Sequence, residues 1–422
     1  MKKFLALIIA LVMALSLVAC GEQKQPETPD VPDDGGEQTA TIKVGFITLH
    51  DENSTYDLNF INAAKEAIAN LGLTENDYIL KTNVPEGQEC YDAAAELADA
   101  GCNIIFADSF GHEPYMIQAA KDFPNVQFCH STGTRAHTEG LSNYHNAFAS
   151  IYEGRYLAGI AAGLKLNEMI EAGQFTADQA KMGYVGAFTY AEVVSGYTSF
   201  YLGAKSVCPT VTMDVTFTGS WYDETLEKEG AQKLIAGGCK LISQHADSLG
   251  APTACENAGV PNVSYNGSTI TAGPNTYIIS SRIDWAPYYE MAIKAVMDGT
   301  EIPADYTGNL STGSVVLTDL NTAVAAEGTQ AAIDAAKAKL ESGELHVFDC
   351  STFTVSGANV KDTMKVDADG HLTSYMADVN TDEAYTGDTE VVHDGYFSES
   401  EFRSAPYFDL FIDGINTLDT AF

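Results

Sequence analysis

The sequence lacks the short motifs that mark the common enzyme classes. It contains no GxSxG nucleophile elbow, P-loop, HExxH zinc motif or GxGxxG dinucleotide fingerprint. His112 with Glu113, and His245 with Asp247, have acid–base residue types, but such pairs are common by chance. We therefore predict no catalytic residues and a protein that is not an enzyme.

Basic residues and closely spaced cysteines are also scarce. The chain has 22 Lys and Arg against 58 Asp and Glu, a formal net charge of -36. Nucleic-acid binding needs clusters of Lys and Arg to neutralise phosphates, so we expect no nucleic-acid partner. None of the eight cysteines forms a CxxC pair, so we predict neither a metal site nor a cofactor.

Only one long apolar run occurs, from Phe4 to Val18, and it follows the basic residues Lys2 and Lys3. The run is shorter than the roughly 20 residues needed to span a bilayer and has the pattern of a signal peptide. A small residue precedes Cys20, as in bacterial lipoprotein signals. We expect residues 1–20 to be such a signal and Cys20 to carry the lipid, which places the protein outside the cytoplasm, anchored to the bacterial cell membrane.

Residues 21–40 are dominated by Glu, Gln, Pro, Thr, Asp and Gly and contain a single valine. Such a stretch cannot bury enough apolar surface to fold. We expect it to be a disordered tether between the membrane anchor and a folded domain.

From residue 41 onward, short apolar runs alternate with amphipathic stretches, a pattern that predicts a parallel sheet covered by helices on both faces. Two similar doubly wound lobes accommodate the number of strands better than one open sheet. The strands are expected at Thr41–Leu49, Tyr78–Lys81, Asn103–Ala107, Val126–His130, Met182–Phe188, Val211–Phe217, Lys240–Gln244, Asn262–Tyr265 and Tyr277–Ser281.

Aromatic rings and carboxylates recur directly after these strands, where α/β sheets bind ligands. Both tryptophans of the chain, Trp221 and Trp285, lie at such places. Carboxylates accept hydrogen bonds and aromatic faces stack on flat rings, so the pattern suits a neutral, flat ligand such as a nucleobase or nucleoside. Helix capping is the competing explanation for single carboxylates, and Ser220 with Asp223 has the spacing of a capping box.

Several ordered motifs resemble the basic membrane protein family of bacterial substrate-binding lipoproteins, which includes purine nucleoside receptors. They are Ile104-Ile105-Phe106-Ala107-Asp108-Ser109-Phe110-Gly111, Tyr152-Glu153-Gly154-Arg155-Tyr156-Leu157-Ala158-Gly159, Gly219-Ser220-Trp221-Tyr222-Asp223, Gln244-His245-Ala246-Asp247-Ser248, Asp284-Trp285-Ala286-Pro287-Tyr288-Tyr289 and Gly343-Glu344-Leu345-His346-Val347-Phe348.

The resemblance implies an α/β type I periplasmic-binding-protein fold, in which two doubly wound lobes are joined by a three-segment hinge. Residues 41–148 would form the first part of lobe 1 and residues 149–265 would form lobe 2. Residues 266–348 would return to complete both lobes. Residues 349–422 would be a C-terminal extension of unknown role.

The resemblance also implies a ligand site between the lobes. Tyr56 and Trp221 would stack on the two faces of a purine. Asp57 and Ser109 would contact the ligand from the first lobe, and Asp247 and Asp284 from the second half. Thr55-Tyr56-Asp57 stands where the nucleoside receptors carry a Ser-Phe-Asn run.

The function implied is the solute-binding lipoprotein of an ABC importer, which captures a purine nucleoside or base and hands it to permease subunits. A sugar or another flat metabolite is the alternative ligand, and a ligand-sensing lipoprotein is the alternative role. A nucleoside hydrolase-like enzyme is the rival from another class.

In the extension, Thr352 to Val355 has the composition of a strand. Asp367-Ala368-Asp369-Gly370 has the wrong spacing for a calcium loop, because Lys365 would occupy the first ligand position. A hairpin turn is predicted there instead.

Overall fold

The computed structural model describes residues 42–379 and 387–422, all of which belong to one compact unit. The predicted signal peptide, Cys20 and the tether therefore lie outside the described residues. Within the described ranges, no helix combines the length and the apolar character needed to cross a bilayer.

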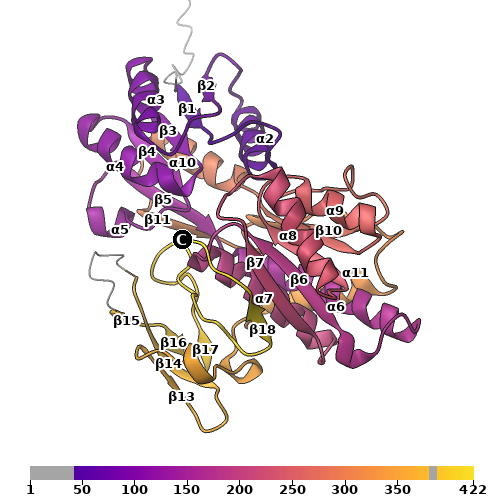
Figure 1. The fold of residues 1–422 in the computed structure, drawn as a ribbon. Helices are drawn as coiled ribbons and strands as arrows, with labels where there is room; N and C mark the ends of the chain where they lie inside the picture. Colours follow the sequence, from indigo (N-terminus) through magenta and orange to yellow (C-terminus); the bar gives the residue numbers. More distant parts are fainter. Residues whose placement is uncertain (1–41, 380–386) are drawn as a thin grey trace, which may run out of the picture. The chain divides into compact units, whose positions relative to one another are not determined.

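The first lobe is built on a six-stranded parallel sheet with the order β11-β5-β4-β3-β1-β2 (Figure 1). Helices α2, α3, α4, α5 and α10 accompany this sheet. The strands are β1 (Val44–Ile47), β2 (Tyr78–Lys81), β3 (Ile104–Ala107), β4 (Gln127–Ser131), β5 (Tyr144–Ala149) and β11 (Asp305–Gly308), and the helices are α2 (Thr55–Asn70), α3 (Gln88–Asp99), α4 (Glu113–Asp122), α5 (Ala136–Glu139) and α10 (Ala286–Asp298).

The second lobe is built on a seven-stranded sheet with the order β12-β10-β9-β8-β6-β7-β18, parallel except for the pair β10–β12. Its strands are β6 (Lys181–Gly186), β7 (Thr212–Phe217), β8 (Leu241–His245), β9 (Asn262–Tyr265), β10 (Tyr277–Ile283), β12 (Val315–Leu317) and β18 (Ile415–Thr417). Its helices are α6 (Ile151–Glu171), α7 (Ala191–Val207), α8 (Glu224–Ala236), α9 (Gly250–Ala258) and α11 (Thr329–Ser342).

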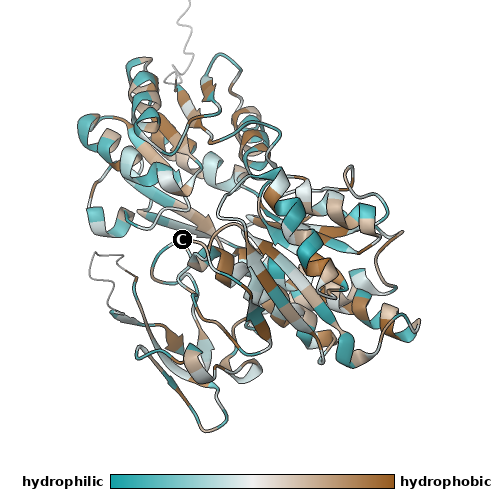
Figure 2. Ribbon diagram, in the orientation of Figure 1, coloured by the Kyte–Doolittle hydropathy of each residue, from teal (hydrophilic) through white to brown (hydrophobic). Residues whose placement is uncertain are grey.

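The sheets are buried on both faces, which explains the continuous apolar runs in the sequence. Every residue of β1, β3 and β5 is buried. The strands accordingly carry much of the hydrophobic colour in Figure 2, whereas many helices show a hydrophilic side. Helices α6 and α7 approach closely at Gly159 and Gly203, where a side chain would collide with the backbone of the other helix.

The chain crosses between the two sheets three times, from β5 to α6, from β10 to α10 and from β11 to β12. Three crossovers between two doubly wound α/β lobes make the type I periplasmic-binding-protein fold that the sequence predicts. Such crossovers allow lobes of this class to open and close as a hinge.

The extension forms small antiparallel sheets of its own before it returns to the second lobe as β18. These strands are β13 (Met364–Val366), β14 (Leu372–Ala377), β15 (Thr389–Glu390), β16 (Val392–His393) and β17 (Tyr396–Phe397). The predicted hairpin turn is confirmed, because Asp367 to His371 joins β13 to β14.

The strand expected at Thr352–Val355 is wrong. Residues Cys350–Thr352 form a short 3-10 helix, and the following residues have no strand partner. Phe353 and Val355 are both 1% exposed. These apolar side chains pack in a hydrophobic core and do not belong to a sheet. Phe353 lies edge-on to Phe408.

Candidate functional site

A small cavity lies where loops from the two sheets meet at the carboxyl ends of their strands. Its volume is about 20 Å³, which is room for about one water molecule. We call it the inner cavity. It is lined by Leu49, Tyr56, Ser109, Phe110 and Thr132 from the first lobe and by Glu192, Trp221, His245 and Asp247 from the second.

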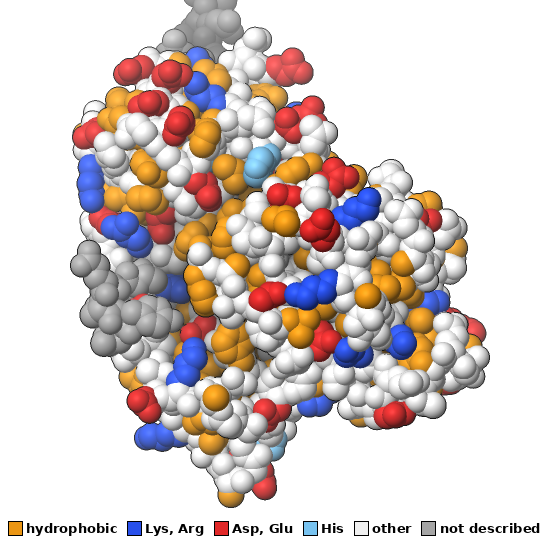
Figure 3. Space-filling view, viewed as in Figure 1, with side chains coloured by type: hydrophobic (Ala, Val, Ile, Leu, Met, Phe, Trp, Pro, Cys, Tyr) orange, Lys and Arg blue, Asp and Glu red, His pale blue; other side chains and the backbone are white. Residues whose placement is uncertain are grey.

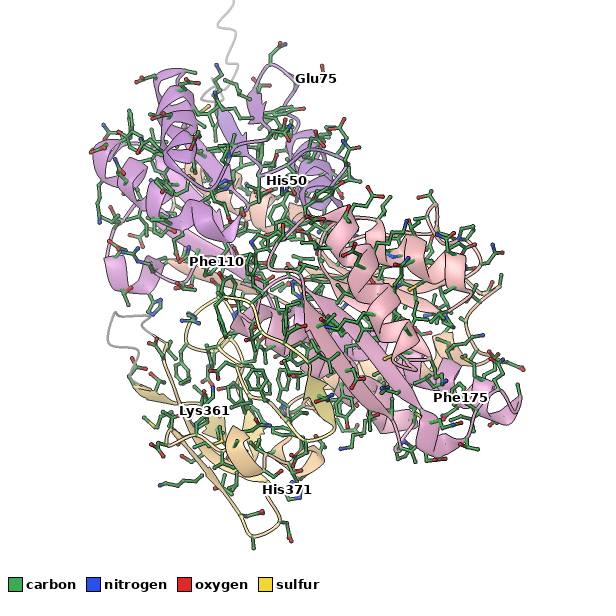
Figure 4. The ribbon with its side chains drawn as sticks, viewed as in Figure 1. His50, Glu75, Phe110, Phe175, Lys361 and His371 are labelled. Atoms are coloured by element: carbon green, nitrogen blue, oxygen red, sulfur yellow. The ribbon has the colours of Figure 1, made fainter. Side chains whose placement is uncertain are left out.

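The two lobes touch around this cavity, which accounts for its small size. The amide of Thr55 donates a hydrogen bond to the carbonyl of Asp247 at 3.0 Å. The rings of Phe110 and Tyr190, from opposite lobes, lie with centroids 5.3 Å apart. Figure 4 shows Phe110 at the edge of the first lobe that faces the second lobe and the extension. The structure is therefore in a closed arrangement.

Tyr56 and Trp221 reach the inner cavity from opposite lobes. Tyr56 lies in the first turn of α2, and its hydroxyl donates to the carbonyl of Asp108 at 2.6 Å, which fixes the ring. Trp221 lies between β7 and α8, and its ring packs edge-on against Phe188 at 5.0 Å. Two aromatic rings on opposite walls can hold a flat ring system between them.

Asp247 and Ser109 supply polar groups to the same cavity. Asp247 follows β8 and is 4% exposed. Burial, together with the nearby carboxylates of Asp57, Glu227 and Glu192, raises the pKa of Asp247 well above its ordinary value. The Ser109 hydroxyl donates to Glu86 at 2.6 Å, so its lone pairs are the part available to a ligand.

Asp57 does not line the inner cavity, although it is the neighbour of Tyr56. Its carboxylate accepts from the His50 amide at 2.7 Å and from the Ser54 hydroxyl. Burial alone would raise the pKa of Asp57, but the His50 side chain, 3.4 Å away, together with these hydrogen bonds holds it below its ordinary value. The carboxylate thus stabilises the loop that begins α2.

Asp284 also lies outside the set of lining residues. Its two oxygens accept from the Ala286 amide at 3.1 Å and from Arg282 at 3.2 Å, at the crossover from β10 to α10. Ligand contacts by Asp57 and Asp284 stay predictions.

Five lining residues were not predicted as ligand contacts: Leu49, Phe110, Thr132, Glu192 and His245. Leu49 is the last residue of a predicted strand and the other four come shortly after one, which is the signal that the sequence offers for them. His245 Nε2 lies 3.4 Å from Glu192 Oε1. Burial lowers the pKa of His245 despite this carboxylate, so we take the imidazole to be neutral at physiological pH.

The predicted capping box at Ser220 is wrong. Asp223 is the N-cap of α8, and its carboxylate accepts from the Leu226 amide at 2.9 Å. The Ser220 hydroxyl instead donates to the carbonyl of Tyr222. The helix begins at Glu224, so Ser220 lies too early in the chain to cap it.

The charge of the inner cavity is acidic or neutral. Its nine lining residues include Glu192 and Asp247 but no Lys or Arg. Acidic side chains also outnumber basic ones on the face seen in Figure 3. Such a site favours an uncharged ligand with hydrogen-bond donors and disfavours a phosphate. No cluster of three His, Cys, Asp or Glu residues within the described ranges could hold a metal ion.

Comparison with known proteins identifies the family of the chain. The family described as "ABC transporter substrate-binding protein PnrA-like" (Bmp) matches residues 45–347. The chain is 32% identical to a purine-binding protein of Brucella abortus over 73% of this chain and 83% of that protein. It is 31% identical to a putative ABC transporter glucose-binding protein of Haloferax volcanii over 61% of this chain and 62% of that protein.

Solved structures support the fold. An ABC transporter solute-binding protein of Aeropyrum pernix superimposes with a TM-score of 0.61 at 19% identity, covering 76% of this chain and 95% of that one. A solute-binding protein of Conexibacter woesei gives a TM-score of 0.58 at 21% identity, covering 72% and 98%. The family match spans both lobes and the inner cavity between them, and the chain therefore belongs to the Bmp family of PnrA-like ABC transporter substrate-binding proteins.

Proposed function

We propose that this protein is a lipid-anchored receptor that captures a purine nucleoside or nucleobase between its lobes and delivers it to the permease of an ABC importer. As a substrate-binding protein of this family, it acts outside the cytoplasm with a small-molecule ligand and permease subunits as partners. The observation that carries the purine assignment is the approach of Tyr56 and Trp221 to one cavity from opposite lobes, beside Asp247.

The names of two relatives point to the same ligand class. The relative from Brucella abortus is named a purine-binding protein. A protein of Lactococcus lactis, 24% identical over 260 residues, is named an ABC transporter nucleoside-binding protein.

The available interactions are large enough for useful affinity. Stacking contributes about 1–3 kcal/mol per aromatic contact. A hydrogen bond contributes about 0.5–1.5 kcal/mol to a neutral partner such as the Asp247 carboxyl and about 1.5–3 kcal/mol to a charged acceptor. Two stacked faces with several such hydrogen bonds can offset the cost of association. A purine is larger than the inner cavity, so the lobes would part to admit it and would enclose it in a wider arrangement than the present one.

The N-terminal anchor and the absence of catalysis belong to this proposal. Residues 1–20 have the signal-peptide pattern, and Cys20 is the lipidation site. The ligand should be returned intact, because the family consists of substrate-binding proteins of transporters. Mass spectrometry of adenosine after prolonged incubation tests this, and release of free adenine would contradict it.

A sugar is the second candidate ligand, and a relative supports it. The protein of Haloferax volcanii, 31% identical to this chain, is named a putative glucose-binding protein. An aromatic face with carboxylates also suits a pyranose. The purine is preferred because aromatic side chains line the cavity from both lobes.

Isothermal titration calorimetry of residues 41–422 separates the two candidates. Adenine, adenosine, guanosine, inosine and glucose would be titrated into folded, ligand-free protein. Saturable micromolar or tighter binding of a purine supports the proposal. Binding of glucose alone would replace the purine with a sugar.

A further inference from the structure

A second, larger cavity adjoins the inner cavity. Its volume is about 460 Å³, within the roughly 300–1,000 Å³ range of small-molecule sites. It shares Phe110, Thr132 and Glu192 with the inner cavity, so the two spaces meet along these side chains. We call this second space the outer chamber.

The extension, residues 349–422, supplies the outer wall of this chamber. Lys361, Arg403, Ala405, Tyr407 and Phe422 line it from that side. The family match ends at residue 347, so this wall comes from a part of the chain beyond the family's matched region. The C-terminus lies near both lobes in Figure 1, and Figure 4 places Lys361 on the extension and Phe110 across from it.

The extension is fastened mainly to the second lobe. Strand β18 pairs with β7 in parallel register. The backbone of Ala421 bonds to Thr189 in both directions, donating to its hydroxyl at 3.0 Å and accepting from its amide at 2.7 Å. Toward the first lobe, the amide and hydroxyl of Ser404 both donate to Asp305, at 2.9 and 2.8 Å. The wall is therefore held in place on both sides of the cleft.

Thr132, at the junction of the two spaces, has two unusual properties. Its φ is 71°, a left-handed conformation that is strained for a β-branched residue. Its side-chain hydroxyl is buried and has no hydrogen-bond partner among the residues that the structure describes, while the residue is 3% exposed. Buried hydroxyls normally have a partner, and strained residues with unsatisfied groups cluster at ligand sites.

The two cationic side chains of the extension that line the chamber are already engaged. The Arg403 guanidinium donates to the backbone carbonyls of Ala405, Asp378, Val379 and Pro406. Lys361 Nζ lies 2.7 Å from an Asp409 oxygen. The chamber therefore suits an uncharged group better than a phosphate.

We propose that the extension completes the ligand site, so that a purine base occupies the inner cavity and the sugar of a nucleoside occupies the outer chamber, with the Thr132 hydroxyl bonded to the ligand where the two meet. This inference rests on the proposed function and deepens it, because it selects the nucleoside over the free base. It also gives the extension a role in recognition.

Ala405→Phe tests the inference by filling the outer chamber. Ala405 lines the chamber, whereas Ala358 is exposed in the same extension and does not. The wild type should bind adenosine at least tenfold more tightly than adenine. Ala405→Phe should remove most of that difference and leave adenine affinity unchanged, and Ala358→Phe should bind both ligands like the wild type. Calorimetry on residues 41–422, with thermal melting to confirm folding, gives these values.

The possible results separate the two proposals. Equal affinities for base and nucleoside, unchanged by Ala405→Phe, would overturn the outer chamber as a sugar site while the purine site stands. Loss of adenine together with adenosine, in a folded variant, would place the base itself in the chamber and also overturn the inference. Failure of every purine to bind the wild type would remove the proposed function and this inference with it.

Thr132 provides an independent test if Ala405→Phe does not fold. Thr132→Val keeps the β-branched shape and removes the hydroxyl, so adenosine affinity should fall about threefold to tenfold, the effect of one hydrogen bond. Thr132→Ser keeps the hydroxyl and should restore binding. Equal adenosine affinities for wild type and Thr132→Val would exclude the Thr132 contact.

Discussion

Removal of the Trp221 ring is the substitution that probes the inner cavity most clearly. Trp221→Ala deletes the tryptophan ring that the second lobe supplies to the cavity. A stacking contact contributes about 1–3 kcal/mol, which corresponds to about 5- to 150-fold in affinity. We expect at least a tenfold loss of purine affinity.

The fold should tolerate this change. Trp221 lies in a loop and is only partly buried. Its backbone carbonyl accepts from the Asp247 amide at 2.9 Å, and this bond does not depend on the side chain. Thermal melting should therefore show a cooperative transition close to that of the wild type.

Titration calorimetry with adenosine measures the effect, and Trp221→Phe is the matched control. Phenylalanine retains a flat ring, so this variant should keep most of the affinity that alanine loses. Unchanged adenosine affinity in Trp221→Ala would refute the reasoning and remove Trp221 from the site.

Three further results are expected. Asp247→Ala should weaken purine binding about tenfold or more, as expected for a lost hydrogen bond to a buried acceptor. Asp247→Asn imitates the neutral carboxyl that burial favours, so its purine affinity should stay within about threefold of the wild type. Equal calorimetric affinities of Asp247→Ala and the wild type would contradict this. Burial raises the pKa of Glu399 from 4.5 to about 7. The protonated carboxyl therefore contributes to the free energy of unfolding in full below pH 4.5, and this contribution is lost as the pH rises through 7. Denaturation curves should show Glu399→Gln gaining on the wild type from pH 5 to pH 8, by on the order of 3 kcal/mol, and a gain that is the same at both pH values would exclude this cause. The seven described cysteines are all unpaired and buried. A thiol reagent should therefore label them slowly in the native protein and should label all seven after unfolding without reductant. Labelling of fewer than seven would reveal a disulfide.

Much of the fold could be predicted from the sequence because the residues of buried parallel strands form continuous apolar runs. The expected strand at Asn262–Tyr265 coincides with β9, in which every residue is buried. Strand β5 (Tyr144–Ala149) was missed, since His145 and Asn146 interrupt its apolar pattern although every residue of the strand is buried. Helix α6 (Ile151–Glu171) was missed because it is apolar around most of its circumference, which hides the helical period.

The ligand site could be predicted only in part. Tyr56, Ser109, Trp221 and Asp247 were selected from the sequence, and all four line the inner cavity. Which other side chains of a strand-end loop face inward depends on the backbone of that loop. Thr132 is the clearest case, because its left-handed conformation follows from tertiary packing and has no signature in its residue type.

The outer chamber could not be predicted from the sequence, for a different reason. Its walls combine loops near residues 132 and 190 with the chain end at Phe422. Contacts between segments separated by so many residues leave no periodicity or spacing to read. Only the folded chain brings them together.

Tryptophan fluorescence tests the central claim, that a purine binds between the lobes against Trp221. The chain has two tryptophans, and Trp285 is buried at 2% exposure and stacked on Phe60. Titration of adenosine should change the emission saturably, with the dissociation constant found by calorimetry, and Trp221→Phe should lose that change. Calorimetric binding of adenosine with emission that is unaltered, or altered equally in Trp221→Phe, would contradict the account.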